Sequence, residues 1–78
     1  MQIGKIIKKY RLKSNMTQVE LGARLGLESG QYISNLERGY PASVSILKML
    51  SRILKIPKKL VINAYVDDSR NKIMNKLW

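Results

Sequence analysis

The sequence contains no cysteine and no histidine. These absences exclude disulfide bonds, zinc fingers and nearly every transition-metal site. They also exclude a catalytic cysteine and a serine activated by histidine. Phenylalanine is also absent, and no Asn-Gly or Asp-Gly pair separates alternating apolar residues, which argues against a β-sheet protein. We therefore expect a small protein that is not an enzyme and that holds no cofactor or metal.

Acidic residues are scarce as well. Five Asp and Glu stand against fifteen Lys and Arg, so the 78-residue chain has a net charge of +10 at pH 7. A field of this sign concentrates polyanions and is hard to reconcile with a small-molecule substrate. Double-stranded DNA is the partner that this charge favours, and an anionic membrane surface is the alternative.

No segment is apolar over the length that a membrane span requires. The longest uncharged apolar stretch runs only from Leu60 to Val66, and lysines occur too early for the core of a signal peptide. We expect a cytoplasmic, nucleoid-associated protein. With 78 residues, of which 45% are hydrophobic, the chain has room for a single core.

Apolar residues recur at helical spacing along the whole chain. This spacing predicts helices over residues 2–13, 17–25, 29–38 and 43–54 and from residue 57 onward, and a basic final segment with one apolar face over residues 70–78. Thr17 and Glu20 have the spacing of a capping box. The other predicted boundary residues are the N-caps Ser29 and Ser43, the terminating glycines Gly26 and Gly39, and Pro57 at the first position of its helix.

The second and third helices are short and are joined by a few residues around a glycine, which is typical of a helix-turn-helix in a basic domain. At 100° per residue, a third helix with Ile33 and Leu36 inside presents Gln31, Asn35 and Arg38 together on its outer side. Amides of Gln and Asn can bond adenine at two atoms, and Arg bonds phosphate or guanine. The sequence thus predicts contacts with the DNA major groove.

Three stretches carry a resemblance to a known family. They are Thr17-Gln18-Val19-Glu20-Leu21-Gly22, Leu25-Gly26-Leu27 and Ile33-Ser34-Asn35-Leu36-Glu37-Arg38-Gly39. In this order they resemble the phage-repressor and Cro-like (Xre-type) helix-turn-helix DNA-binding domain, and the resemblance covers about residues 3–66. It implies an all-α, compact five-helix repressor-like domain over residues 1–66, with the helix-turn-helix at about residues 17–38 and a short C-terminal helical extension over residues 67–78.

The resemblance also implies roles for individual residues. Base contacts are expected from Gln31, Tyr32, Ser34 and Asn35. Phosphate contacts are expected from Gln18, Arg38, Tyr40 and Ser43, and Gln18 is also expected to support the recognition helix. Arg11 and Glu37 match a buried salt bridge that ties the first helix to the third.

The sequence departs from the family pattern at two places. The turn after Gly26 is one residue longer than usual, which leaves open whether Gly30, Gln31 or Tyr32 reaches the first base edge. The ring of Tyr32 could equally cover the edge of the core. Gly22 stands where the family mostly has alanine, and since glycine within a helix costs about 1 kcal/mol, another helix is expected to pass close to it.

The predicted function is sequence-specific transcriptional regulation by a repressor-like or Cro-like protein that binds an operator as a homodimer. Antitoxins and restriction-modification controllers share this fold, so a further protein partner stays open. The less favoured alternative is a basic amphipathic binder of membrane surfaces that uses residues 2–13. Ile73, Met74, Leu77 and Trp78 in the last segment are candidate dimer contacts, and the alternative is that they fold back on the core of the same chain.

Overall fold

The fold consists of helices only. The structure, a computed structural model, describes the backbone of residues 2–77 and the side chains of residues 2–70. Over this range the helices are α1 (Gln2–Lys13), α2 (Gln18–Arg24), α3 (Gln31–Glu37), α4 (Val44–Leu54) and α5 (Lys58–Leu77), with no strand. The expected all-α, five-helix fold is confirmed, and α1 has the predicted bounds.

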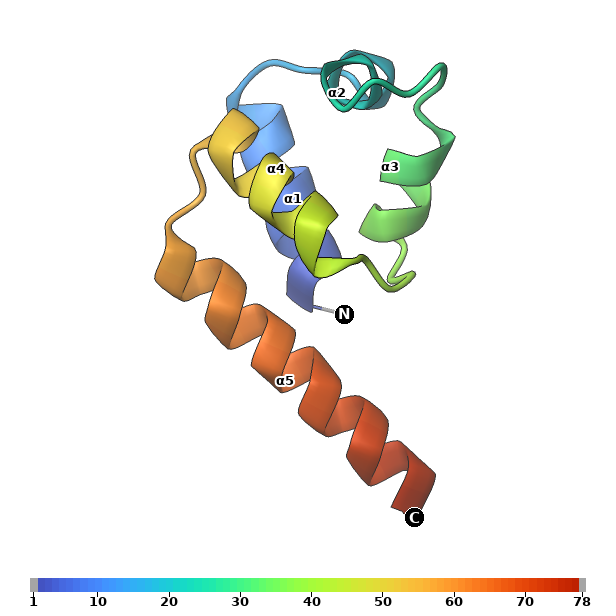
Figure 1. Ribbon diagram of the computed structural model, residues 1–78, viewed down its shortest axis with the longest axis vertical. Coiled ribbons are helices and arrows are strands. Elements are labelled where there is room, and N and C mark those ends of the chain that lie inside the picture. Colours follow the sequence, from blue (N-terminus) through green and yellow to red (C-terminus); the bar gives the residue numbers. More distant parts are fainter. Residues whose placement is uncertain (1, 78) are drawn as a thin grey trace.

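The helices surround α1, which contacts α3, α4 and α5, while α2 packs mainly on α3 (Figure 1). In the view of Figure 1, α4 lies between α3 on one side and the start of α5 on the other. From there α5 runs past the other helices to the C-terminal end of the described chain. The helix-turn-helix formed by α2 and α3 therefore lies at one side of the molecule and most of α5 at another.

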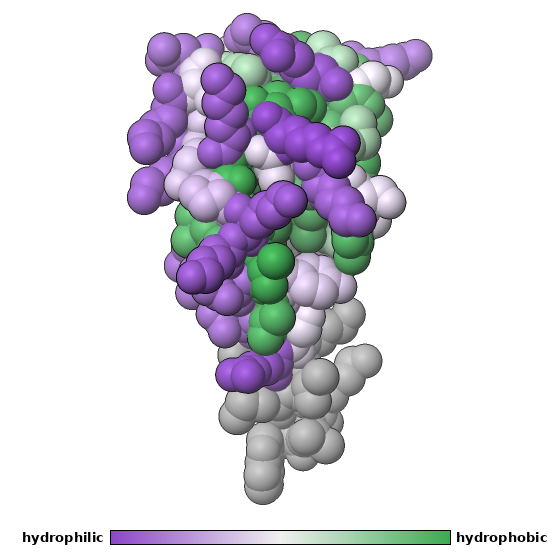
Figure 2. Space-filling model, turned by 60° about the vertical axis from the view of Figure 1, so that its left-hand side comes forward, coloured by the Kyte–Doolittle hydropathy of each residue, from purple (hydrophilic) through white to green (hydrophobic). Residues whose placement is uncertain are grey.

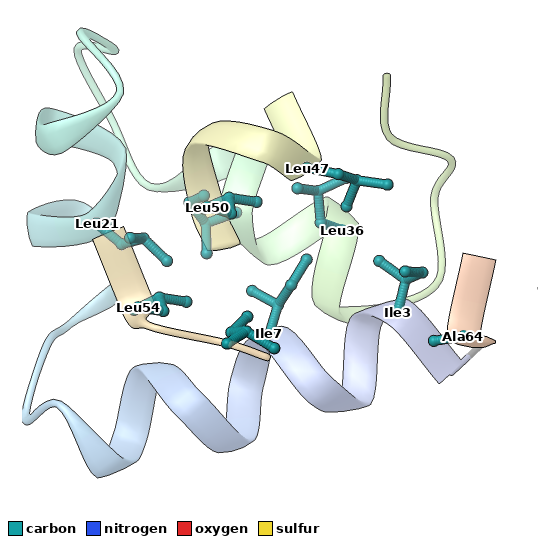
Figure 3. Close-up of a cluster of buried hydrophobic side chains, with 10 residues drawn as sticks. Ile3, Ile7, Leu21, Leu36, Leu47, Leu50, Leu54 and Ala64 are labelled. Atoms are coloured by element: carbon teal, nitrogen blue, oxygen red, sulfur yellow. The ribbon is translucent and has the colours of Figure 1, made fainter. Parts of the chain in front are cut away.

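The core takes side chains from all five helices (Figure 3). Ile33 and Leu36, the predicted inward pair of α3, are almost completely buried. Burying a side chain of this size stabilises the fold by about 1.5–3 kcal/mol, so α3 is fixed in place by its own inner side. The core residues are Ile3, Ile7, Leu21, Ile33, Leu36, Leu47, Leu50, Leu54, Ile56 and Ala64.

The first four helices end in the same way. The backbone N–H of Leu27 donates to the carbonyl of Gly22, and that of Tyr40 donates to the carbonyl of Asn35, each closing a Schellman turn. The residue with positive φ in these four turns is Asn15, Gly26, Gly39 or Lys55. The two predicted glycine stops are confirmed, whereas the turns at Asn15 and Lys55 were not foreseen.

Helix starts follow the prediction at two places and differ at two others. The capping box of Thr17 and Glu20 and the N-cap Ser43 are confirmed. The prediction for Ser29 is wrong, because Gly30 is the N-cap of α3 and is buried against the backbone of α2, where a larger residue would not fit. The Ser29 hydroxyl oxygen instead accepts a bond from the N–H of Gln31 at 3.3 Å.

The start of the last helix also differs from the prediction, because Pro57 is not its first residue. α5 begins at Lys58, and the carbonyl of Pro57 accepts from the N–H groups of Leu60 and Val61. Pro57 is therefore the residue before the first helical position.

The C-terminal region forms one helix across the expected boundary between residues 66 and 67. α5 continues from Lys58 to Leu77, and Asp68 is buried against the start of α1. Its carboxylate accepts from the backbone N–H of Gln2 at 2.8 Å and of Ile3 at 3.0 Å. These N–H groups have no partner within α1, so Asp68 acts as its N-terminal cap, and the packed domain extends at least to Asp68.

The candidate dimer contacts Ile73, Met74, Leu77 and Trp78 lie outside the residues whose side chains the structure describes. Their role stays a prediction.

Candidate nucleic-acid interface

Three polar side chains form one connected row on the outer side of α3. The side-chain amide of Gln31 donates to Oδ1 of Asn35 at 2.9 Å, and Nη2 of Arg38 donates to the same oxygen at 2.7 Å. Gln31 and Arg38 are exposed and Asn35 is half-buried. The structure thus brings together the three residues that helical spacing places on one side.

The longer turn determines which side chain begins this row. Gly30 is buried, and a Cβ atom there would lie 2.8 Å from backbone atoms of Gln18 and Val19. Tyr32 is half-buried and packs against the core. Of the three residues considered for the first base contact, Gln31 alone is exposed.

Ser34 is half-buried on α3. No described contact assigns its hydroxyl group a partner, so its expected base contact stays a prediction.

The expected phosphate-contacting residues flank the row. Tyr40 is 58% exposed, and the guanidinium carbon of Arg38 lies 5.8 Å from the centre of its ring. This geometry is that of a cation–π contact, which joins Tyr40 to the Arg38 end of the row. Ser43 is exposed, and its hydroxyl accepts from the N–H of Ile46 at 3.2 Å, so it caps α4.

Gln18 supports α3 directly, as its match to the family pattern implies. Its side-chain amide donates to Oε1 of Glu37 at 3.3 Å, which joins the first turn of α2 to the last turn of α3. The N-terminus of a helix attracts anions through its free N–H groups. Gln18 therefore occupies a position suited to phosphate while it also holds α3.

A buried ion pair fixes the orientation of α3 against α1. Nε and Nη2 of Arg11 donate to the two carboxylate oxygens of Glu37, at 2.7 and 3.1 Å. The side-chain exposures are only 10% and 5%. The hydrogen bond with Glu37 raises the pKa of Arg11, and desolvation opposes this rise.

Arg11 makes a further contact beyond the pair. Its Nη1 donates to the carbonyl of Met16 at 2.9 Å, in the loop that leads into α2. Since Glu37 also accepts from Gln18, these two charged side chains connect α1, α2 and α3.

The residues that the structure describes support neither a metal site nor a membrane span. No three acidic side chains there lie together as a metal site. No helix there combines the length and apolar character needed to cross a bilayer. The membrane-surface alternative depends on the apolar side of residues 2–13, and this side is already buried, because Ile3 and Ile7 are part of the core.

Comparison with known proteins agrees with this geometry. A family model described as helix-turn-helix matches residues 7–60, which include all of α2, α3 and α4 and both members of the buried ion pair. No curated protein and no solved structure matches the chain. Since the matched region is more than half of the sequence, the chain belongs to the Xre and Cro type of helix-turn-helix family.

Proposed function

We propose that this protein is a sequence-specific transcriptional regulator that binds operator DNA as a homodimer, with α3 in the major groove. The observation that carries the proposal is the row of Gln31, Asn35 and Arg38, which lies on the outer side of a helix whose inner side is buried in the core. Family membership supports DNA binding in general. The net charge of +10 supports attraction to phosphates regardless of sequence.

The expected contacts divide into two classes. Amide and hydroxyl groups on α3 distinguish base pairs, and groups at the helix starts and the α3–α4 loop hold the backbone. The proposed base contacts are Gln31, Tyr32, Ser34 and Asn35, and the proposed phosphate contacts are Gln18, Arg38, Tyr40 and Ser43.

Asn35 provides the sharpest test of base recognition. We expect Asn35→Ala to weaken operator binding by about 1–3 kcal/mol, roughly 5- to 150-fold in Kd, and to leave binding to random duplex DNA nearly unchanged. The reason is that its amide bonds a base edge, whereas nonspecific affinity comes from phosphate contacts. The operator is first identified by selecting bound sequences from a random duplex pool, and both affinities are then measured by fluorescence anisotropy.

Lys8→Ala serves as the matched control, because Lys8 is exposed on α1 and contributes only general positive charge. This variant should affect operator and random DNA equally. Equal losses on both DNAs for Asn35→Ala would contradict base recognition by α3.

The proposed dimer is tested by shortening α5. A single recognition helix contacts only a few base pairs, whereas a two-fold dimer contacts two half-sites about 34 Å apart. We expect a chain that stops after Arg70 to stay folded, because Asp68 still caps α1, but to sediment as a monomer and bind the operator more weakly. Circular dichroism checks the fold. An unchanged sedimentation coefficient would show that Ile73, Met74, Leu77 and Trp78 have no role in dimerisation.

A further inference from the structure

An apolar groove lies between α4 and α5. Its volume is about 620 Å³, and its floor includes the buried side chains of Leu47 and Ile56. Val44 on one helix and Ile62 on the other are 52% and 59% exposed at its edges. On the side of the molecule where α5 begins, Figure 2 shows hydrophobic side chains uncovered between hydrophilic ones.

The lining residues have a regular spacing on both helices. On α4 they occur at positions 44, 47, 48, 51 and 52, and on α5 at positions 58, 61, 62 and 65. Both sets follow the i, i+3, i+4, i+7 spacing of one helical side. On α4 the set extends over about 12 Å of helix axis. Two such sides next to each other form the groove into which a third amphipathic helix packs.

The rim of this groove is positively charged. Lys48 and Arg52 on α4 and Lys58 on α5 line it and are exposed, and no described lining residue is acidic. Among the side chains of residues 2–70, none of these three cations belongs to an ion pair. A second copy of the chain that placed its own groove here would bring the same three charges against them, so local like-charge repulsion disfavours this groove as a contact between two copies.

We propose that the groove between α4 and α5 is a docking site for an acidic amphipathic helix of a partner protein. Apolar side chains of the partner fill the floor between Leu47 and Ile56, and its Asp or Glu side chains pair with the cationic rim. Figure 1 shows α3 on the other side of α4 from the start of α5, so this partner leaves the proposed DNA-contacting row uncovered. The site is independent of the proposed function and is tested without DNA.

The probe is a fluorescein-labelled helical peptide of about 20 residues, with Leu at i, i+3, i+4 and i+7 spacing and Glu on its other side. We expect saturable binding that weakens with salt. Reversing the rim with Lys48→Glu and Arg52→Glu together should raise Kd at least tenfold, and Ile62→Asp should do the same. Anisotropy titrations with the full chain give each Kd, and circular dichroism verifies that each variant is folded.

Controls match each change in chemistry and exposure. Lys8→Glu with Lys9→Glu reverses the same number of positive charges on α1. Leu12→Asp places the same acidic side chain at a residue that is 56% exposed and lies outside the groove. These variants should keep wild-type affinity. A scrambled peptide of identical composition should bind at least tenfold more weakly, since it keeps the charge but loses the apolar side.

Three results would overturn the proposal. One is equal binding of the scrambled peptide, which means attraction of any polyanion. Another is equal weakening by the α1 control variants. The third is self-association of the wild-type chain that Ile62→Asp abolishes, which means that a second copy fills the groove.

Discussion

Glu37→Ala is expected to lower the free energy of unfolding by about 3–5 kcal/mol, the cost of leaving a buried charge without its partner. Arg11 is 8% exposed, and two of its hydrogen bonds end on the Glu37 carboxylate. Alanine at position 37 also removes the acceptor of the Gln18 amide. Urea denaturation followed by circular dichroism measures the change.

A double variant that removes both charges shows whether the cost of Glu37→Ala comes from the lost ion pair or from the buried Arg11 charge left without a partner. Arg11→Met with Glu37→Leu replaces both charges by apolar side chains of similar size and should recover most of the lost stability. Glu28→Ala is the control, because Glu28 is exposed in the loop before α3 and its replacement should change the unfolding free energy by less than about 0.5 kcal/mol. A cost for Glu37→Ala no larger than that of Glu28→Ala would contradict the structural role of the pair. The double variant stays informative even if Glu37→Ala does not fold.

Gly4→Ala should be the second most damaging change, with an expected loss of about 3 kcal/mol. Here α1 crosses α3 so closely that a Cβ atom on Gly4 would overlap the carbonyl oxygen of Leu36 and lie 3.0 Å from that of Glu37. Backbone atoms cannot rotate away, so α1 would have to move and loosen Ile3 and Ile7 in the core.

The sign of this effect is informative. Helix propensity alone predicts that alanine stabilises α1 by about 1 kcal/mol relative to glycine. Thermal unfolding of Gly4→Ala beside Lys5→Ala, an exposed neighbour on the same helix, separates the two effects. Stabilisation in both variants would show that the helices are not held in this close contact.

The features that the sequence predicts well are local. The bounds of α1, the capping box at Thr17, the turn at Gly26 and the inward direction of Ile33 and Leu36 all depend on residues a few positions apart. Periodicity and capping express these short-range preferences directly. The row of Gln31, Asn35 and Arg38 could be predicted for the same reason.

The features that escaped prediction depend on distant contacts. A boundary was expected between residues 66 and 67, but α5 runs through it, and Asp68 caps α1, which lies 65 or more positions away in sequence. The one local sign of the close crossing between α1 and α3 was the presence of a glycine, Gly4, in a helix whose other residues are mostly apolar or basic.

The glycine at position 22 is required by the longer turn between α2 and α3. A Cβ atom at this position would lie 2.5 Å from the carbonyl oxygen of Ser29, so the close neighbour is the longer turn and not another helix as expected from the sequence. α3 and the turn before it are therefore not an independent unit that can be exchanged alone. In a relative that carries alanine at this position, a grafted α3 with its loop would be displaced, so an exchange of α3 between such proteins requires this glycine as well.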